Sequence, residues 1–201
     1  MAARACGSGE RDRRVIDPPP IIQLLMNDPN RTDLSELRYP FNVVHCTLWS
    51  ADGLTDETAF DGIDKRRTRR LMGTLVASPF VGSDENGKEG CFFCFPDLSC
   101  RTHGTYRLRF VLMRLEPSEL QSDGCTPIIT ETMSETFTVY TAKGFPGMRP
   151  STALTKALKK QGYAISVKKG NEKATGSSTN PEVDEKEANS IPRKRSRNGG
   201  N

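Results

Sequence analysis

Four side chains that could bind zinc lie close together in the sequence. Cys91, Cys94, Cys100 and His103 have the spacing C-x2-C-x5-C-x2-H, and thiolate and imidazole are the usual ligands of structural zinc. The intervening residues are largely phenylalanine and leucine, which is typical of a core strand, and free cysteine is itself often buried. Side chains three residues apart on a strand point to opposite faces, so Cys91 and Cys94 could share a metal only if the strand bent. We therefore expect buried structural cysteines and no metal or other cofactor, with a zinc-binding module as the remote alternative.

The sequence offers little for enzyme chemistry. It contains two histidines, His45 and His103, and His45 lies inside an apolar stretch. The motifs G-x-S-x-G, H-E-x-x-H and the P-loop do not occur. A Cys–His nucleophile is left open, but no pattern locates one, and we predict that the protein is not an enzyme.

Basic residues gather in four runs. The first, R-D-R-R at 11–14, is followed by three prolines at 18–20, which fix φ, remove three backbone donors and predict a stiff, extended segment. The second is K-R-R-T-R-R at 65–70, the third comprises five lysines between 156 and 169, and the fourth is R-K-R-S-R at 193–197. Arginine and lysine at the ends of strands can reach the phosphates of a polyanion. The net charge of +4 is small, but the clustering of the basic residues in four runs favours nucleic-acid binding.

The fourth run also has the character of a nuclear import signal. It follows Pro192 in a polar segment, and its basic residues are Arg193, Lys194, Arg195 and Arg197. The N-terminus lacks the apolar core of a secretory signal, so the six cysteines are expected to be reduced. We expect a nuclear protein with a possible cytoplasmic pool, and no membrane span, because no run of about 18 apolar residues occurs.

The elements that would position these residues read as strands separated by turns. Strands are predicted at 21–24, 39–49, 69–82, 90–100, 104–117, 134–142 and 163–169. One helix is predicted after Ser151 or Thr152, with Leu154 and Leu158 on one face and Gly162 at its end. This order predicts an all-β sandwich or barrel with a short C-terminal helix over residues 1–170. Residues 171–201 have almost no apolar side chains and are predicted to be a disordered tail with a basic run.

Three stretches resemble the velvet domain of fungal developmental regulators. They are R-V-I-D-P-P-P-I-I-Q-L, the segment from L-M-G-T-L-V-A-S-P-F-V-G to R-T-H-G-T-Y-R-L-R-F, and F-T-V-Y-T-A-K-G-F-P-G-M-R-P-S-T-A-L-T-K-A-L-K-K-Q-G-Y-A-I-S-V-K-K-G. The resemblance covers about Arg4 to Gly170 and is closest to a VosA-like or VelC-like member. It implies an immunoglobulin-like sandwich similar to the Rel-homology DNA-binding domain of NF-κB. It also implies a homo- or heterodimer of velvet chains that regulates sporulation, spore viability and secondary metabolism.

The resemblance also implies which residues contact double-stranded DNA. In the family, basic residues just before D-P-P-P do so, and the matching positions here are Arg11 and Arg13, with Arg14 adjacent. Lys168 and Lys169 are a second choice from the third basic run. Where some members carry a further basic residue, this chain has Gly9 and Glu10. The alternative is a protein-interaction module that reaches DNA only through a velvet partner. G-C-F-F-C-F-P-D-L-S-C is, by resemblance, a fold signature and not a metal site.

Overall fold

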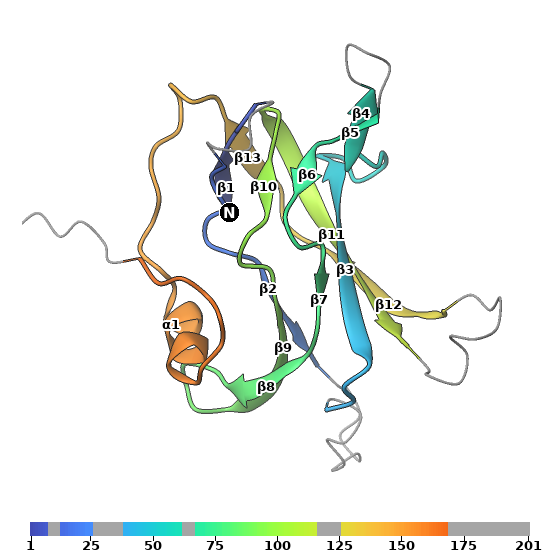
Figure 1. Cartoon of the computed structure of the whole chain (residues 1–201), viewed down its shortest axis with the longest axis vertical. Helices are drawn as coiled ribbons and strands as arrows, with labels where there is room; N and C mark the ends of the chain where they lie inside the picture. Colours follow the sequence, from blue (N-terminus) through green and yellow to red (C-terminus); the bar gives the residue numbers. More distant parts are fainter. Residues whose placement is uncertain (8–12, 26–37, 62–66, 116–125, 169–201) are drawn as a thin grey trace, which may run out of the picture. The chain divides into compact units, whose positions relative to one another are not determined.

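The computed structural model describes residues 1–7, 13–25, 38–61, 67–115 and 126–168. In these ranges the chain is built mostly from β-strands, with one short helix, α1 (Figure 1). Two sheets enclose the main hydrophobic core. The predicted fold class, an all-β sandwich with a short C-terminal helix, is confirmed.

The larger sheet is centred on β11 (Gly104–Arg114). Its strand order is β1 (Ala2–Arg4), β13 (Phe137–Tyr140), β11, β3 (Asn42–Ser50) and β7 (Val76–Ala77), and β12 (Ile128–Met133) also pairs with β11. β11 and β3 are antiparallel over nine residue pairs, from Tyr106 with Ser50 to Arg114 with Asn42. Alternate residues of both strands are buried, as the period-two pattern of residues 104–117 predicts.

The smaller sheet consists of β2 (Ile21–Leu24), β9 (Glu89–Cys94) and β8 (Phe80–Ser83). β9 is buried on both faces: Cys91 and Phe93 belong to the main core, whereas Phe92 and Cys94 pack with Leu158 of α1 (Ala153–Lys160). The helix therefore covers the outer face of this sheet. Burial on both sides explains why C-F-F-C-F has no polar alternation.

Two shorter strand pairs complete the described structure. They are a hairpin of β4 (Ala59–Asp61) with β5 (Arg67–Arg69), and β6 (Leu71–Met72) paired with β10 (Ser99–Cys100). The single strand predicted at 69–82 is wrong, because this segment is divided among β6, β7 and β8, each with a different partner. Gly73 adopts φ +110°, and a Cβ there would lie 2.5 Å from the Asp97 carbonyl oxygen. The chain turns at this close contact and crosses between the sheets.

The helix follows its prediction and the segment after it does not. Thr152 is the N-cap, its hydroxyl accepts the Thr155 N–H at 3.1 Å, and Gly162 follows the helix at φ +94°. Residues 163–168 form no strand, because the Lys168 N–H donates to the Ser151 hydroxyl at 2.8 Å and not to a sheet edge. Position 169 and the predicted tail at 171–201 lie outside the described residues. Within the described ranges, no helix has the length and apolar character that a membrane crossing requires.

Candidate nucleic-acid interface

The cysteines do not assemble a metal site in the described part of the chain. Cys91 and Cys94 lie on opposite faces of β9, in different hydrophobic clusters, as the strand geometry predicts. His103 is exposed. No three His, Cys, Asp or Glu side chains among the described residues are placed to hold a metal ion. Burial raises the pKa of Cys91 to about 11 and that of Cys94 to about 12, so these thiols stay protonated at neutral pH.

The N-terminal arginine segment comprises residues 11–17, and its described part, residues 13–17, lies along the turn between β9 and β10. The Arg13 guanidinium donates from Nε to the Ser99 hydroxyl at 3.0 Å and from Nη2 to the Asp97 carbonyl at 2.8 Å. Three residues later, the Ile16 N–H donates to the Leu98 carbonyl at 2.7 Å. Arg14 is exposed, and Arg11 lies outside the described residues. Arg13 uses two of its five N–H donors to hold its own position.

Near β10, a row of backbone hydrogen bonds joins four chain segments. The Gly7 N–H donates to Arg101 at 3.0 Å, the Arg101 N–H to Arg70 at 2.9 Å, and the Arg70 N–H to Thr58 at 2.7 Å. The row brings the start of the chain beside β10 and beside the second basic run, although these segments are far apart in sequence. Arginines from different parts of the sequence therefore occupy one end of the fold.

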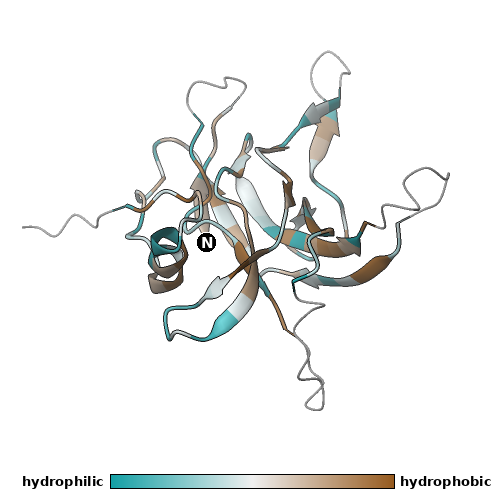
Figure 2. Cartoon of the chain, turned by 60° about the horizontal axis from the view of Figure 1, so that its bottom comes forward, coloured by the Kyte–Doolittle hydropathy of each residue, from teal (hydrophilic) through white to brown (hydrophobic). Residues whose placement is uncertain are grey.

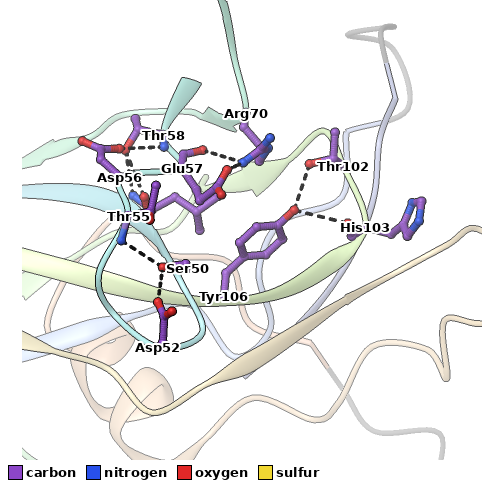
Figure 3. A network of polar contacts seen from close by, with 11 residues as sticks. Ser50, Asp52, Thr55, Asp56, Glu57, Thr58, Arg70, Thr102, His103 and Tyr106 are labelled. Atoms are coloured by element: carbon purple, nitrogen blue, oxygen red, sulfur yellow. Dashed lines mark hydrogen bonds and ion pairs between the residues drawn. The ribbon is translucent and has the colours of Figure 1, made fainter. Parts of the chain in front are cut away.

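A polar network fixes the surrounding loops (Figure 3). Arg70 forms an ion pair with Glu57, and its guanidinium carbon lies 5.1 Å from the centre of the Phe60 ring and 5.8 Å from that of Tyr106. The Tyr106 hydroxyl in turn donates to the His103 carbonyl at 3.2 Å. Only 15% of the Arg70 side chain is exposed, so Arg70 serves mainly to hold these loops together.

The loop after β3 is stabilised by its own short hydrogen bonds. The Asp52 carboxylate accepts from the Ser50 hydroxyl and from the Leu54 N–H, and the Ser50 oxygen accepts from the Thr55 N–H at 3.0 Å. The hydrogen bond from Ser50 and then that from Leu54 lower the pKa of Asp52 below its ordinary value. The turn at residues 51–53 is thus a locally determined structure.

Lys168 lies beside the D-P-P-P segment. Its Nζ is 3.8 Å from an Asp17 carboxylate oxygen, and the other Asp17 oxygen accepts the Arg149 N–H. Asp17 is four residues from Arg13. Arg13 and Lys168, two predicted DNA contacts that are far apart in sequence, therefore lie on the same segment and beside it, respectively. Lys169 is not among the described residues. Lys168 is already paired with Asp17, and the sequence did not indicate this ion pair.

Two exposed arginines of the second basic run were not singled out by sequence reasoning. Arg67 and Arg69 are exposed on β5, whereas Arg70 turns inward. Positions 65 and 66 of that run lie outside the described residues. The R-T-R spacing of 67–69 could have indicated them, because residues two apart share one face of a strand.

Comparison with known proteins identifies relatives of this fold. A family model described as Velvet factor matches residues 1–64 and 55–172. The sexual development regulator VELC of Pyricularia oryzae is 57% identical over 176 residues, covering 86% of this chain and 40% of the relative. The spore development regulator vosA of Beauveria bassiana is 50% identical over 176 residues, covering 86% of this chain and 64% of the relative.

A third relative, from Chaetomium globosum, is named as part of a velvet complex. It is 38% identical over 161 residues, covering 79% of this chain and 34% of the relative. This chain therefore spans less than two thirds of the length of each of the three relatives. The family model covers most of the chain, and the resemblance predicted from the sequence is confirmed: the chain belongs to the velvet factor family.

Proposed function

We propose that this chain is a sequence-specific DNA-binding regulator of transcription in fungal development, sporulation and secondary metabolism, acting as a dimer with another velvet chain. The names of its relatives, sexual and spore development regulators, support the developmental role. The observation that carries DNA binding is the gathering of arginine-bearing segments at one end of the sandwich through the backbone row from Gly7 to Thr58. Ordered guanidinium groups at such an end can contact successive phosphates of a duplex.

The anchoring of the N-terminal segment suits it to this role. Arg13 and Ile16 are both tied to residues 97–99, so the described part of the segment is ordered before DNA binds. Ordering a backbone costs about 1–2 kcal/mol per residue, and an ordered segment avoids that cost on binding. Arg11, Arg13 and Arg14 remain the proposed DNA contacts, with Lys168 and Lys169 as the second choice.

The test is the salt dependence of binding by the purified chain to duplex DNA. Removing two phosphate contacts with Arg11→Ala and Arg13→Ala should make the slope of log K against log salt shallower by roughly 1.8, since each contact contributes about 0.9. The matched control, Lys88→Ala with Lys143→Ala, removes two exposed charges that lie outside the four basic runs and should leave the slope unchanged. Equal slopes in the two double variants would remove the N-terminal arginines from the interface. Binding that requires an added velvet partner would favour the interaction-module alternative.

Strand β12 is the proposed contact with a second velvet chain. Ile128, Ile129 and Met133 are 58%, 48% and 38% exposed, and among the described strands β12 pairs with β11 alone. Its acidic residue, Glu131, is paired with Arg109. Figure 2 shows, in brown, hydrophobic stretches at the end of the pair where β11 ends and β12 begins. An exposed edge strand with apolar side chains invites pairing with another chain, and one relative is named as part of a velvet complex.

Charge placed on that edge should prevent the pairing. Ile129→Lys should convert the dimer to a monomer in light scattering after gel filtration, whereas Val81→Lys, at an exposed position of β8, should not. A dimer of unchanged stability in Ile129→Lys would exclude β12.

Nuclear import through Arg193, Lys194, Arg195 and Arg197 is part of the same proposal. A tagged chain without residues 171–201 should lose nuclear accumulation in cells that lack other velvet proteins. Unchanged nuclear signal there would show that the basic run is not the import signal.

A further inference from the structure

The β4–β5 hairpin carries a basic face. Ala59 pairs with Arg69 and Asp61 pairs with Arg67, so the two arginines lie on one face of the hairpin and their cross-strand neighbours are one small and one acidic residue. Both arginines are exposed. The face therefore presents two guanidinium groups against a single carboxylate.

The opposite face fastens the hairpin to the sandwich. Phe60 pairs with Thr68 on that face, and the Arg70 guanidinium lies over the Phe60 ring while pairing with Glu57. The backbone of Arg70 also bonds to Thr58 and to Arg101. These contacts hold the base of the hairpin, so the backbone that carries Arg67 and Arg69 is fastened to the sandwich.

A two-stranded hairpin is one of the structures that fits the major groove of B-DNA, where arginine makes paired hydrogen bonds to guanine. The hairpin projects at the upper end of Figure 1, whereas α1 lies at the lower end. The Arg70 carbonyl accepts the Arg101 N–H, and Arg101 lies two residues after Ser99, whose hydroxyl accepts from Arg13. A duplex held by the N-terminal arginine segment would thus lie near the basic face of the hairpin.

We propose that the β4–β5 hairpin is a second DNA-contacting element, which inserts Arg67 and Arg69 into the major groove and reads sequence, while the N-terminal arginines hold the phosphates. This inference rests on the proposed DNA-binding function. It assigns the hairpin to double-stranded DNA and not to an acidic protein surface, because a two-stranded ribbon fits the major groove and arginine makes paired hydrogen bonds to guanine there.

The decisive experiment compares two duplexes: one selected from a random pool by the wild-type chain, and a scrambled version of it. Arg67→Gln with Arg69→Gln should weaken binding to the selected duplex by roughly 5- to 100-fold and reduce its advantage over the scrambled one. Lys88→Gln with Lys143→Gln, which removes the same charge at exposed positions outside the four basic runs, should change neither quantity.

A substitution that should strengthen DNA binding distinguishes direct contact from a purely structural effect. Asp61→Asn removes the acidic group from the basic face at an exposed position and should strengthen binding to the selected duplex. Unchanged affinity in all three hairpin substitutions, with wild-type binding intact, overturns the inference and leaves the proposed function standing. A hairpin variant that binds DNA normally but loses its velvet partner also overturns it. A wild-type chain that binds no duplex overturns the proposed function as well.

Discussion

Asp17 joins three separate segments, and its removal should destabilise the domain measurably. Asp17 is 4% exposed, its carboxylate accepts the Arg149 N–H, and Lys168 Nζ lies 3.8 Å away. Its backbone N–H and carbonyl pair with Ala2, each at 2.8 Å. The side chain thus connects the D-P-P-P segment to the loop before α1 and to the segment after it. The informative change is Asp17→Ala.

The expected loss follows from these contacts. A hydrogen bond to a charged acceptor contributes about 1.5–3 kcal/mol, and the Arg149 N–H would lose that acceptor. The Lys168 side chain is 35% exposed, so water can solvate the unpaired ammonium and the ion pair adds only about 0–1 kcal/mol. Asp17→Ala should therefore cost about 2–4 kcal/mol. Asp17→Asn, which keeps an acceptor oxygen, should cost about 1 kcal/mol.

Urea unfolding followed by circular dichroism measures both values. The urea concentration at the midpoint of unfolding should fall in the order wild type, Asp17→Asn, Asp17→Ala. The slope of the unfolding free energy against urea concentration should stay unchanged. Lys168→Gln should have the smallest effect, because its partner keeps the Arg149 hydrogen bond. A loss below about 0.5 kcal/mol for Asp17→Ala, the range of ordinary surface substitutions, would refute the assigned role.

Two further predictions concern the core and the helix. Burial and then the neighbouring Cys6 raise the pKa of Cys100 from 9.0 to about 12. The folded state therefore keeps this proton at pH values where the unfolded chain has lost it, and the unfolding free energy should fall as pH rises above 9. Cys100→Ala should make the decline of unfolding free energy between pH 9 and 10 shallower by up to about 1.4 kcal/mol, and an unchanged decline would contradict the assignment. Gln161 accepts the Ser83 N–H and donates to the Ser83 carbonyl, both at 2.7 Å, so Gln161→Ala should cost about 1–2 kcal/mol and speed amide exchange at Ser83. Lys160→Ala is the control, and equal exchange in the two variants would show that Gln161 does not fasten α1 to β8.

The sequence predicted those elements whose pattern is local. Alternation over residues 104–114 identified β11, and a capping threonine with Leu158 one turn after Leu154 identified α1. The opposite orientations of Cys91 and Cys94 followed from strand geometry alone. Each of these features depends on neighbours within a few residues.

Elements fixed by distant contacts were missed. The division of 69–82 depends on Gly73 meeting the Asp97 backbone, more than twenty residues away. β1 was not predicted because its three residues pair in parallel with β13 near the other end of the domain. The segment from 163 has the composition of a strand, but its end bonds to Ser151 in the loop before the helix. No local pattern reports such partners.

The same limit applies to the candidate site. The resemblance and the basic runs proposed Arg13 and Lys168 as DNA contacts, which stays a prediction, and they did not indicate the groups that hold these side chains. Asp97 and Ser99 lie more than eighty residues from Arg13, and Asp17 lies far from Lys168. The basic face of the β4–β5 hairpin required the register of β5 with β4, which the sequence prediction did not contain.

The position of the three prolines is explained by the hydrogen bonds on either side of them. Ile16 and Asp17 donate their N–H groups to Leu98 and Ala2, and the ladder of β2 with β9 begins at Ile21. Between these anchors the prolines have no N–H to satisfy, while the Pro20 carbonyl still accepts the Phe95 N–H at 2.9 Å. The segment is thus held to the β9–β10 region at both ends without a strand of its own. A rigid link of this kind connects the smaller sheet to the segment that carries Arg13, and under the proposed function a fixed base would reduce the entropy that the arginines lose on DNA.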